Sequence, residues 1–136
     1  MKRLREIRDD ETGNITLPLI VLVVAFILFI GLVVDGAGKI QSGDQANQIA
    51  AGAARSAVNA LTGDAVLSGT VGIDSIKAQN VAQAYINTAG ATGTVSVTGN
   101  SVNVTVSVDY DTIFLSIIGI NTLTGRASAS AALTDG

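Results

Sequence analysis

Residues 15–34 read ITLPLIVLVVAFILFIGLVV, and this stretch decides the fold. It contains no charged residue, and sixteen of its twenty residues are Ile, Leu, Val or Phe. As a helix it would be about 30 Å long, which matches the hydrocarbon core of a bilayer. Pro18 falls in the first turn, where its missing N–H group costs little. The stretch therefore predicts a transmembrane helix.

An apolar run near an N-terminus can also be a buried core helix or a cleaved signal peptide. The rest of a 136-residue chain supplies too little protein to surround a core helix of this length. A signal peptide has a shorter apolar region, of about 7–15 residues, and an A-x-A-like cleavage site. Val34-Asp35-Gly36 does not resemble such a site. We therefore expect an uncleaved signal anchor.

The flanking charges predict the orientation of the anchor. Four basic residues precede the run and only one follows it closely: Lys2, Arg3, Arg5 and Arg8, then Lys39. Because basic flanks stay in the cytoplasm, we expect a single-pass protein of the cytoplasmic (inner) membrane. Its predicted parts are a cytoplasmic charged head at 1–14, a transmembrane helix at 15–34 and an exported domain at 35–136.

Composition argues against most catalytic and nucleic-acid-binding functions. The chain has no Cys and no His, so it lacks the usual thiol nucleophile, general base and transition-metal ligands. Its net charge is −3, whereas nucleic-acid binding needs a basic face. We expect no enzymatic activity, no cofactor, no metal and no nucleic-acid partner.

Two short motifs could be functional sites, but each also has a simple structural explanation. Asp109 and Asp111 place two carboxylates on one strand face, as a calcium ligand pair or an acid–base pair would be. A calcium site needs several more oxygen ligands, so we favour a solvated strand end. Asn103-Val104-Thr105 is a formal glycosylation sequon, but it lies inside a predicted strand and we assign it no role.

The exported part begins with an Ala-rich helix that carries an apolar stripe at three- and four-residue spacing. Gly63 is its expected end. Only the glycines at 36, 38 and 43 separate it from the apolar run, so we expect one long helix that could bend there. The expected packing residues are Ala46, Ile49, Ala50, Ala53, Ala54, Ala57 and Val58.

The stripe has two candidate partners. Its Ala-x-x-x-Ala spacings, such as Ala46/Ala50 and Ala53/Ala57, suit contacts with a helix of a neighbouring subunit. They also suit close packing on a sheet of the same chain. We favour the sheet, because an apolar valine face further along the chain needs a cover.

That valine face comes from a predicted hairpin. Residues 94–98 and 101–110 alternate valine with polar residues on either side of Gly99-Asn100, a two-residue turn with Gly first. Such a turn pairs Thr98 with Ser101, which places all the valines on one face. A loop at 63–72 and a helix at 75–88, capped by Asp74, come before the hairpin. The expected buried face of that helix consists of Ala78, Val81, Ala82 and Tyr85.

Two further segments complete the predicted domain. Residues 112–120, TIFLSIIGI, form a short apolar connector of one or two helical turns. Residues 123–133 alternate again and predict a third strand lined by small side chains. The fold class is α+β: a transmembrane helix extends into a domain in which a three-stranded antiparallel sheet packs on the helix.

Several of these segments together resemble the TadE/TadG-like proteins of the tight-adherence (Flp) pilus and secretion system. The similar motifs are the end of the charged head, the end of the apolar run, the Ala-rich helix and the last strand. They read Glu11-Thr12-Gly13-Asn14, Val33-Val34-Asp35-Gly36, DQANQIAAGAARSAVNAL and Thr124-Gly125-Arg126-Ala127-Ser128-Ala129. The resemblance implies a pilin-like exported domain.

The resemblance also bears on processing of the N-terminus. Family members that are cleaved as prepilins have Gly before the cleaved bond and Glu at the fifth mature position. Here Gly13 and Asn14 would flank that bond, but the fifth position is Pro18. The sequence is therefore similar to the TadG-like subset, which keeps its N-terminus as an uncleaved anchor.

These observations predict a membrane-anchored structural or minor pilin-like component of a Tad (Flp) pilus assembly or related secretion apparatus. Its expected partners are the lipid bilayer and other subunits of that apparatus, in a homo- or hetero-oligomer. It would act by helix packing and protein–protein contacts, in a surface filament or at the base. Asp35 is expected to mark the membrane boundary or to face a charge of a neighbouring subunit. The alternative function is a membrane-tethered binding module for a small ligand or cell-wall polymer.

Overall fold

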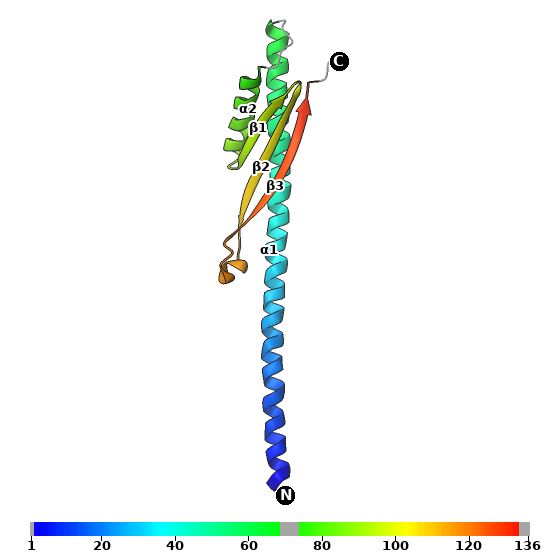
Figure 1. Cartoon of the computed structure of the whole chain (residues 1–136), viewed down its shortest axis with the longest axis vertical. Coiled ribbons are helices and arrows are strands. Elements are labelled where there is room, and N and C mark those ends of the chain that lie inside the picture. The colour runs from blue at the N-terminus through cyan, green and yellow to red at the C-terminus, as the bar shows by residue number, and fades with distance from the viewer. Residues whose placement is uncertain (1, 69–73, 134–136) are drawn as a thin grey trace.

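Helix α1 (Lys2–Ser68) runs unbroken through half of the chain, and the other elements lie beside its C-terminal half (Figure 1). The computed structural model describes the backbone of residues 2–68 and 74–133 and the side chains of residues 15–62 and 74–133. One long helix was predicted, and the glycines at 36, 38 and 43 do not interrupt it. By length and composition α1 is able to cross a membrane, and the described part of the chain contains no second such helix.

The start of α1 differs from the prediction. The helix begins at Lys2, so Pro18 lies inside it rather than in its first turn. A proline at an interior position removes one backbone hydrogen bond from a helix, and α1 continues through it nonetheless.

The predicted end of α1 at Gly63 is wrong. The helix continues for another turn, to Ser68, so the predicted loop at 63–72 is helical in its first half. A single glycine inside a helix costs only about 1 kcal/mol relative to alanine, and Ala65 and Leu67 beyond it are good helix formers. The rest of the predicted loop, residues 69–72, lies outside the described residues.

Helix α2 (Ser75–Thr88) has the predicted bounds and the predicted cap. The Asp74 carboxylate accepts hydrogen bonds from the backbone N–H groups of Ile76 and Lys77, at 3.1 and 3.2 Å. Its buried face differs from the prediction, because Ile86 is fully buried and Tyr85 is 41% exposed. The buried residues of α2 are Ala78, Ala82 and Ile86.

Strands β1 (Thr92–Thr98), β2 (Ser101–Asp111) and β3 (Thr122–Ala132) form an antiparallel sheet in the order β1-β2-β3. The hairpin register is the predicted one, with Thr98 opposite Ser101 and Val97 opposite Val102. Gly99 has φ of +58°, as the first position of a tight hairpin turn requires. The α+β fold with a three-stranded sheet on a long helix is thus confirmed.

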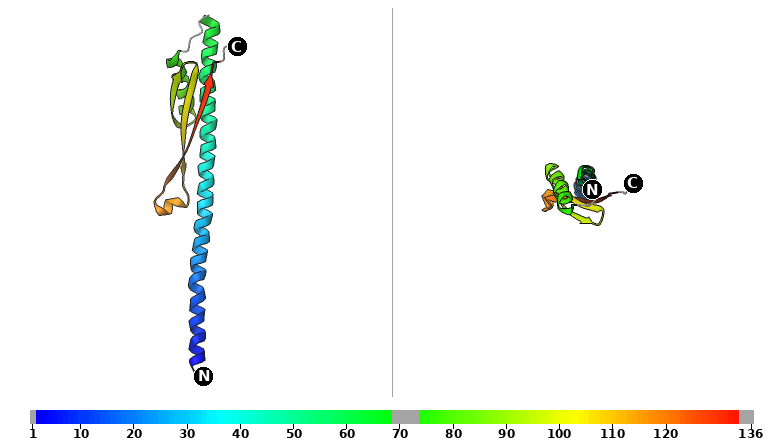
Figure 2. Two further views of the ribbon diagram at one scale, coloured as in Figure 1. Left: turned by 45° about the vertical axis from the view of Figure 1, so that its right-hand side comes forward. Right: turned by 90° about the horizontal axis from the view of Figure 1, so that it is seen from above.

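Both helices cover the same face of the sheet (Figure 2). That inner face presents Val102, Val104 and Val106 of β2, which are fully buried between the helices and the sheet. The outer face presents threonine, serine and asparagine to solvent. Three alanines of β3, namely Ala127, Ala129 and Ala131, are partly buried against the core cluster on α1. Small side chains on both surfaces allow helix and sheet to approach closely.

The connector between β2 and β3 contains a single 3₁₀ turn, η1 (Leu115–Ile118), as the prediction of one or two turns anticipated. Gly119 ends the turn with φ of +90°, a conformation that glycine adopts without strain. The connector lies beside α1 at the end of the sheet nearest the apolar run (Figure 1). Its position brings it to the boundary of the predicted membrane span.

Candidate functional site: the seam of α1 and the Asp35 latch

Within residues 15–62, where the side chains of α1 are described, the buried residues form one continuous stripe, which we call the seam. They recur every three or four residues along one side of the helix. Nearly all are small. They are Gly31, Asp35, Gly38, Ser42, Ala46, Ile49, Ala50, Ala53, Ala54, Ala57 and Leu61.

Three glycines of the long helix lie directly under aromatic rings. A Cβ atom at Gly31 would lie 2.7 Å from the Cβ atom of Phe114. A Cβ atom at Gly38 would collide with the Tyr110 ring, and one at Gly52 with the ring and hydroxyl of Tyr85. The sequence suggested Gly38, with the glycines at 36 and 43, as a point of bending and gave Gly31 and Gly52 no role. In the structure Gly31, Gly38 and Gly52 each make room for a side chain from another element.

One glycine of the sheet lies against the backbone of α1 rather than under a side chain. Gly125 of β3 faces the backbone of α1, so that a Cβ atom there would collide with Ser42 and Gly43. Helix and strand backbones therefore touch at this point with no side chain between them. In the sequence Gly125 stood out only as part of a family motif, and no packing role was predicted for it.

The predicted packing residues all lie in or beside the seam. Six of them are between 0% and 8% exposed, and Val58 is partly buried against the same cluster. Their neighbours in this cluster come from α2 and the sheet of the same chain. This arrangement corresponds to the sheet alternative; contact with a neighbouring subunit stays a prediction.

Asp35 forms the most connected polar site of the seam. Its Oδ1 atom accepts the backbone N–H of Ile113 at 2.9 Å, and Oδ2 accepts those of Phe114 and Leu115 at 3.0 and 2.7 Å. The Tyr110 hydroxyl donates a longer hydrogen bond to Oδ1, at 3.4 Å. We call this set of contacts the Asp35 latch.

The latch supplies a cap that the connector lacks. The first N–H groups of a helical turn have no partner within the turn. The residue at the N-cap position of η1 is Phe114, and its side chain makes no capping hydrogen bond. Asp35 supplies the acceptors from another element, as a capping aspartate does within one helix. The carboxylate thereby fixes the connector to α1.

The electrostatics of the latch favour an ionised Asp35. Burial raises the pKa of this carboxyl, but the hydrogen bonds from Ile113, Leu115, Phe114 and Tyr110 together outweigh burial and hold the pKa below its usual value. Burial, and then the charge and hydrogen bond of Asp35, raise the pKa of Tyr110. At neutral pH the latch therefore joins a carboxylate to a neutral phenol.

The sequence pointed to Asp35 as a boundary residue and did not indicate the latch. Its position at the membrane boundary stays a prediction. Its carboxylate is fully buried and its hydrogen bonds go to its own chain. The sequence offered no signal for the latch, because Asp111 and Thr112 at the start of the connector are themselves residue types that cap helical turns.

The remaining motifs lie apart from the seam. Asp109 is exposed and accepts a hydrogen bond from Thr124 Oγ1 at 2.8 Å, while Asp111 is exposed at the strand end. Asn103 is exposed on the outer face of the sheet. Gly13 and Asn14 lie within α1 at positions where no side chain is described.

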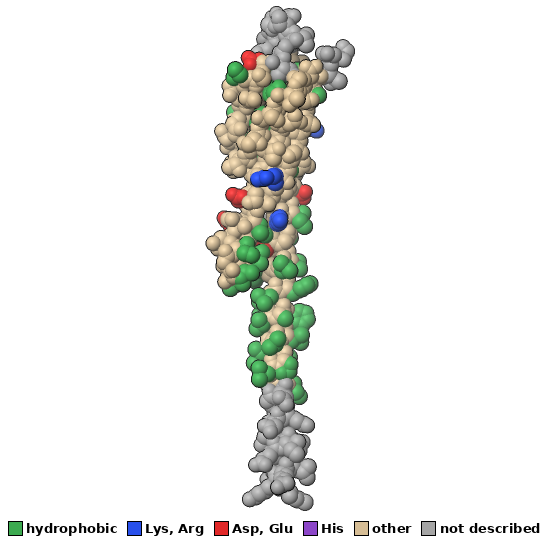
Figure 3. All heavy atoms as spheres, viewed as in Figure 1, with side chains coloured by type: hydrophobic (Ala, Val, Ile, Leu, Met, Phe, Trp, Pro, Cys, Tyr) green, Lys and Arg blue, Asp and Glu red, His purple; other side chains and the backbone are tan. Residues whose placement is uncertain are grey.

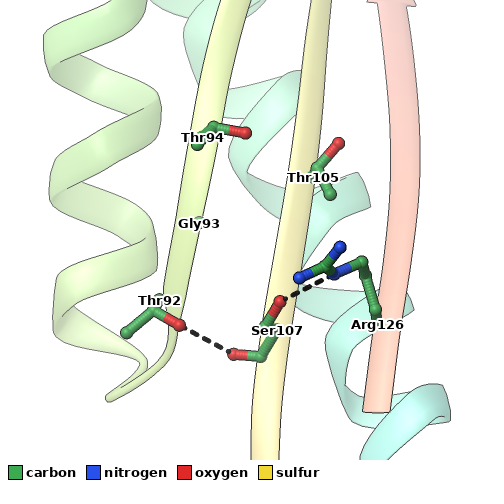
Figure 4. Close-up of a pocket in the computed structure, with 6 residues that line it drawn as sticks. All are labelled: Thr92, Gly93, Thr94, Thr105, Ser107 and Arg126. Carbon is green, nitrogen blue, oxygen red and sulfur yellow. Dashed lines mark hydrogen bonds between the residues drawn. The ribbon is translucent and has the colours of Figure 1, made fainter. Parts of the chain in front are cut away.

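The outer face of the sheet contains a shallow hollow of about 370 Å³ (Figure 4). It lies at Gly93, between the outward side chains of Thr92 and Thr94 on β1 and those of Thr105 and Ser107 on β2. The Arg126 Nε group donates to Ser107 Oγ at 3.2 Å at its edge. The lining is polar and without an aromatic ring: Thr92, Gly93, Thr94, Thr105, Ser107 and Arg126.

Comparison with known families found a match over residues 13–60. The matching family model is described as Tad, a putative Flp pilus-assembly TadE/G-like family. The chain carries a TadE/G-like segment. This finding confirms the family that the sequence predicted. Comparisons with curated proteins and with solved structures gave no significant match.

The TadE/G-like segment coincides with the apolar run, the latch residue Asp35 and most of the seam of α1. Residues 13–60 include the whole apolar run, Asp35 and the seam as far as Ala57. Helix α2 and strands β2 and β3, which the seam packs against, lie outside the matched range, and so does β1. The family signal is thus concentrated in the helix. A role associated with the Tad pilus follows from it.

Proposed function

We propose that this TadE/G-like protein is a membrane-anchored, minor pilin-like structural subunit of a Tad (Flp) pilus assembly or related secretion apparatus. The observation that carries the proposal is the uncovered apolar length of α1. Side chains along the run are more than half exposed at most positions, for example Leu17 at 69% and Phe29 at 65%. A run of this size needs lipid or other subunits around it.

The proposed mechanism is non-catalytic. The apolar run is held in the inner membrane with the head in the cytoplasm, and the exported domain makes contacts outside. The seam supports this role because it joins the domain rigidly to the anchor, so that a force or displacement of one reaches the other. A TadG-like, uncleaved N-terminus is part of the proposal.

A cellular experiment tests the structural role. In a strain that assembles Flp pili, deletion of the gene should abolish or strongly reduce surface filaments, and the full chain should restore them. A variant with Val24→Arg and Leu28→Arg places two charges in the apolar run and should not restore them. The matched control is Asn47→Arg with Asn59→Arg, at exposed positions of α1 beyond the run. Normal filaments in the deletion strain would contradict the proposal.

Cysteine labelling tests the orientation. The chain has no native cysteine, so each introduced thiol reports on one position. A membrane-impermeant maleimide added outside intact cells or spheroplasts should label Ile76→Cys, whose side chain is 70% exposed on α2. It should label Ile7→Cys in the head only after the membrane is permeabilised. The reverse pattern would invert the proposed topology.

The alternative function, a tethered binding module, would use the hollow at Gly93. The arrangement in its favour is one cation, Arg126, beside several hydroxyl groups on an exposed face. Titration with soluble anionic cell-wall fragments should then shift the amide signals of β1 and β2 around the hollow, and Arg126→Gln should abolish the shifts. Equal shifts in the wild type and the variant, or none in either, would exclude this use.

A further inference from the structure

The connector between β2 and β3 exposes more large apolar side chains than any other described part of the exported domain. Four of its isoleucines are between 43% and 80% exposed: Ile113, Ile117, Ile118 and Ile120. Residues 112–121, TIFLSIIGIN, include no charged residue. Three similarly exposed side chains lie elsewhere in the described domain, at Ile40, Ile76 and Tyr85. A surface of this kind is typical of a contact with lipid or another protein.

The latch places this connector level with the end of the apolar run. Asp35, which binds the N–H groups of the connector, is the first residue after the run. Phe114 packs on Gly31, which lies three residues inside the run. With a rise of about 1.5 Å per residue, that contact lies about 5 Å below the end of the run. Figure 3 shows the hydrophobic atoms of the connector beside those of α1.

The backbone of the connector is suited to a medium with little water. Unpaired N–H groups are costly in lipid, so a segment that enters it must satisfy them internally. Thr112 N–H donates to Asn121 O at 3.0 Å, which closes the base of the connector. Seven of its backbone N–H groups have acceptors within the chain: those of residues 112, 113, 114, 115, 117, 119 and 120.

We propose that the connector, residues 112–121, is a second membrane contact that lies in the boundary between headgroups and acyl chains beside α1. Its occupant is lipid, because its apolar surface continues that of the run and lies at the same level. The exposed carboxylates of Asp109 and Asp111 come immediately before it and stay on the water side. The inference rests on the proposed membrane anchoring.

The proposal has a structural consequence. A single transmembrane helix leaves a domain free to tilt, whereas two contacts fix its angle to the bilayer. Asp35 is central to this geometry, because its hydrogen bonds hold the connector against the end of the apolar run of α1. Its charge can lie this close to lipid because four donors surround it and the connector covers it.

Spin-label accessibility in the full-length chain tests the proposal. Single cysteines at Ile117, Phe26 and Ile76 are labelled with a nitroxide, and the chain is reconstituted at high dilution into phosphatidylcholine vesicles. Collisions with oxygen, which concentrates in lipid, are compared with those of a water-soluble nickel chelate. Ile117→Cys should show an oxygen-to-nickel ratio several-fold above that of Ile76→Cys. Phe26→Cys, in the apolar run, should likewise show a ratio above that of Ile76→Cys.

The three positions separate the possible failures. A lipid-like ratio at Phe26 with a water-like ratio at Ile117 would overturn the second contact and leave the anchor intact. A water-like ratio at Phe26 would overturn the anchoring itself. Low accessibility of Ile117 to both reagents would mean that protein, such as a second copy of the chain, covers the connector, and would overturn lipid as its occupant.

Discussion

The Asp35 carboxylate accepts the backbone N–H of Leu115 at 2.7 Å, across 80 residues of chain. This hydrogen bond and those from Ile113 and Phe114 join the end of the apolar run to the connector of the sheet. The seam continues the same contact along α1 toward Leu61. The apolar run and the domain beside the C-terminal half of α1 are therefore one packed unit, as the proposed structural role requires.

Removal of the latch acceptor should release the connector. In Asp35→Leu, three backbone N–H groups lose their acceptors, so hydrogen exchange at residues 113–115 should accelerate strongly in detergent micelles. Asp35→Asn keeps one acceptor oxygen and should have an intermediate effect. Tyr110→Phe removes only the longest of the four hydrogen bonds and should change exchange little. Asp44→Asn, at an exposed position, is the control. Unchanged protection in Asp35→Leu would contradict the latch.

The lowered pKa of Asp35 predicts an acid transition. A carboxyl whose folded pKa lies below its unfolded value of about 3.9 stabilises the fold fully above that value, and the contribution is lost as pH falls through the folded pKa. The amide signals of residues 113–115 should therefore stay constant from neutral pH down into the acid range and move only below about pH 4. Asp35→Asn should lack this transition. A transition well above pH 5 would mean that burial outweighs the hydrogen bonds.

Local rules account for what the sequence predicted well. A two-residue turn and strict alternation fix the register of a hairpin, so the pairing of Val97 with Val102 followed from the sequence. The cap at Asp74 involves donors only two and three residues away. The latch and the ring contact of Gly38 instead join residues more than seventy positions apart. No periodicity in the sequence encodes such pairs. Asp35 was therefore assigned to the membrane boundary or to a charge of a neighbouring subunit, and the glycines at 36, 38 and 43 to a bend.

The helix glycines allow a matched test of close packing. Gly38→Ala introduces a methyl group against the Tyr110 ring and should destabilise the domain by about 1–3 kcal/mol, the range for overpacking. Gly36→Ala meets no atom within 4 Å, so its better helix propensity should stabilise by up to about 1 kcal/mol. Thermal unfolding followed by circular dichroism would show opposite shifts. Equal shifts would mean that the ring does not lie over Gly38.

Gly125 of β3 provides a stricter test of close packing, because the atoms next to it belong to the backbone of α1. Gly125→Ala directs a methyl group at Ser42 and Gly43, and neither can move away by rotation of a side chain. We expect it to widen the space between β3 and α1 and to destabilise more than Gly38→Ala. The control is Ser128→Ala on the exposed face of the same strand. A neutral Gly125→Ala would show that the two backbones do not touch.

The N-terminus should remain uncleaved. Pro18 occupies the position at which processed family members have Glu, so a prepilin peptidase should not cut after Gly13. Mass spectrometry of the protein from native membranes should find peptides that span Gly13-Asn14. A mature chain that begins at Asn14 would place the protein among the processed pilins and contradict the proposed uncleaved anchor.

The Ala stripe of the seam decides how the domain is held together. Ala53 and Ala57 are fully buried, and they belong to the same core cluster as α2 and the valines of β2. Leucine at either position must push these elements apart or adopt a strained rotamer, which costs roughly 1–3 kcal/mol. A small domain has little more than about 5 kcal/mol to lose, so the double variant should unfold the domain near room temperature.

The matched control for the Ala stripe is Arg55→Leu, which adds the same side chain on the exposed side of α1. In thermal unfolding of the full chain in detergent, the double variant Ala53→Leu with Ala57→Leu should have a much lower unfolding temperature than the wild type. The unfolding temperature of Arg55→Leu should be almost unchanged. If the double variant unfolds like the wild type while filament assembly fails, the stripe serves an interface between subunits. In that case the small side chains of these alanines allow close contact with a helix of a neighbouring subunit. The valine face of β2 is then covered by α2 and other residues of α1.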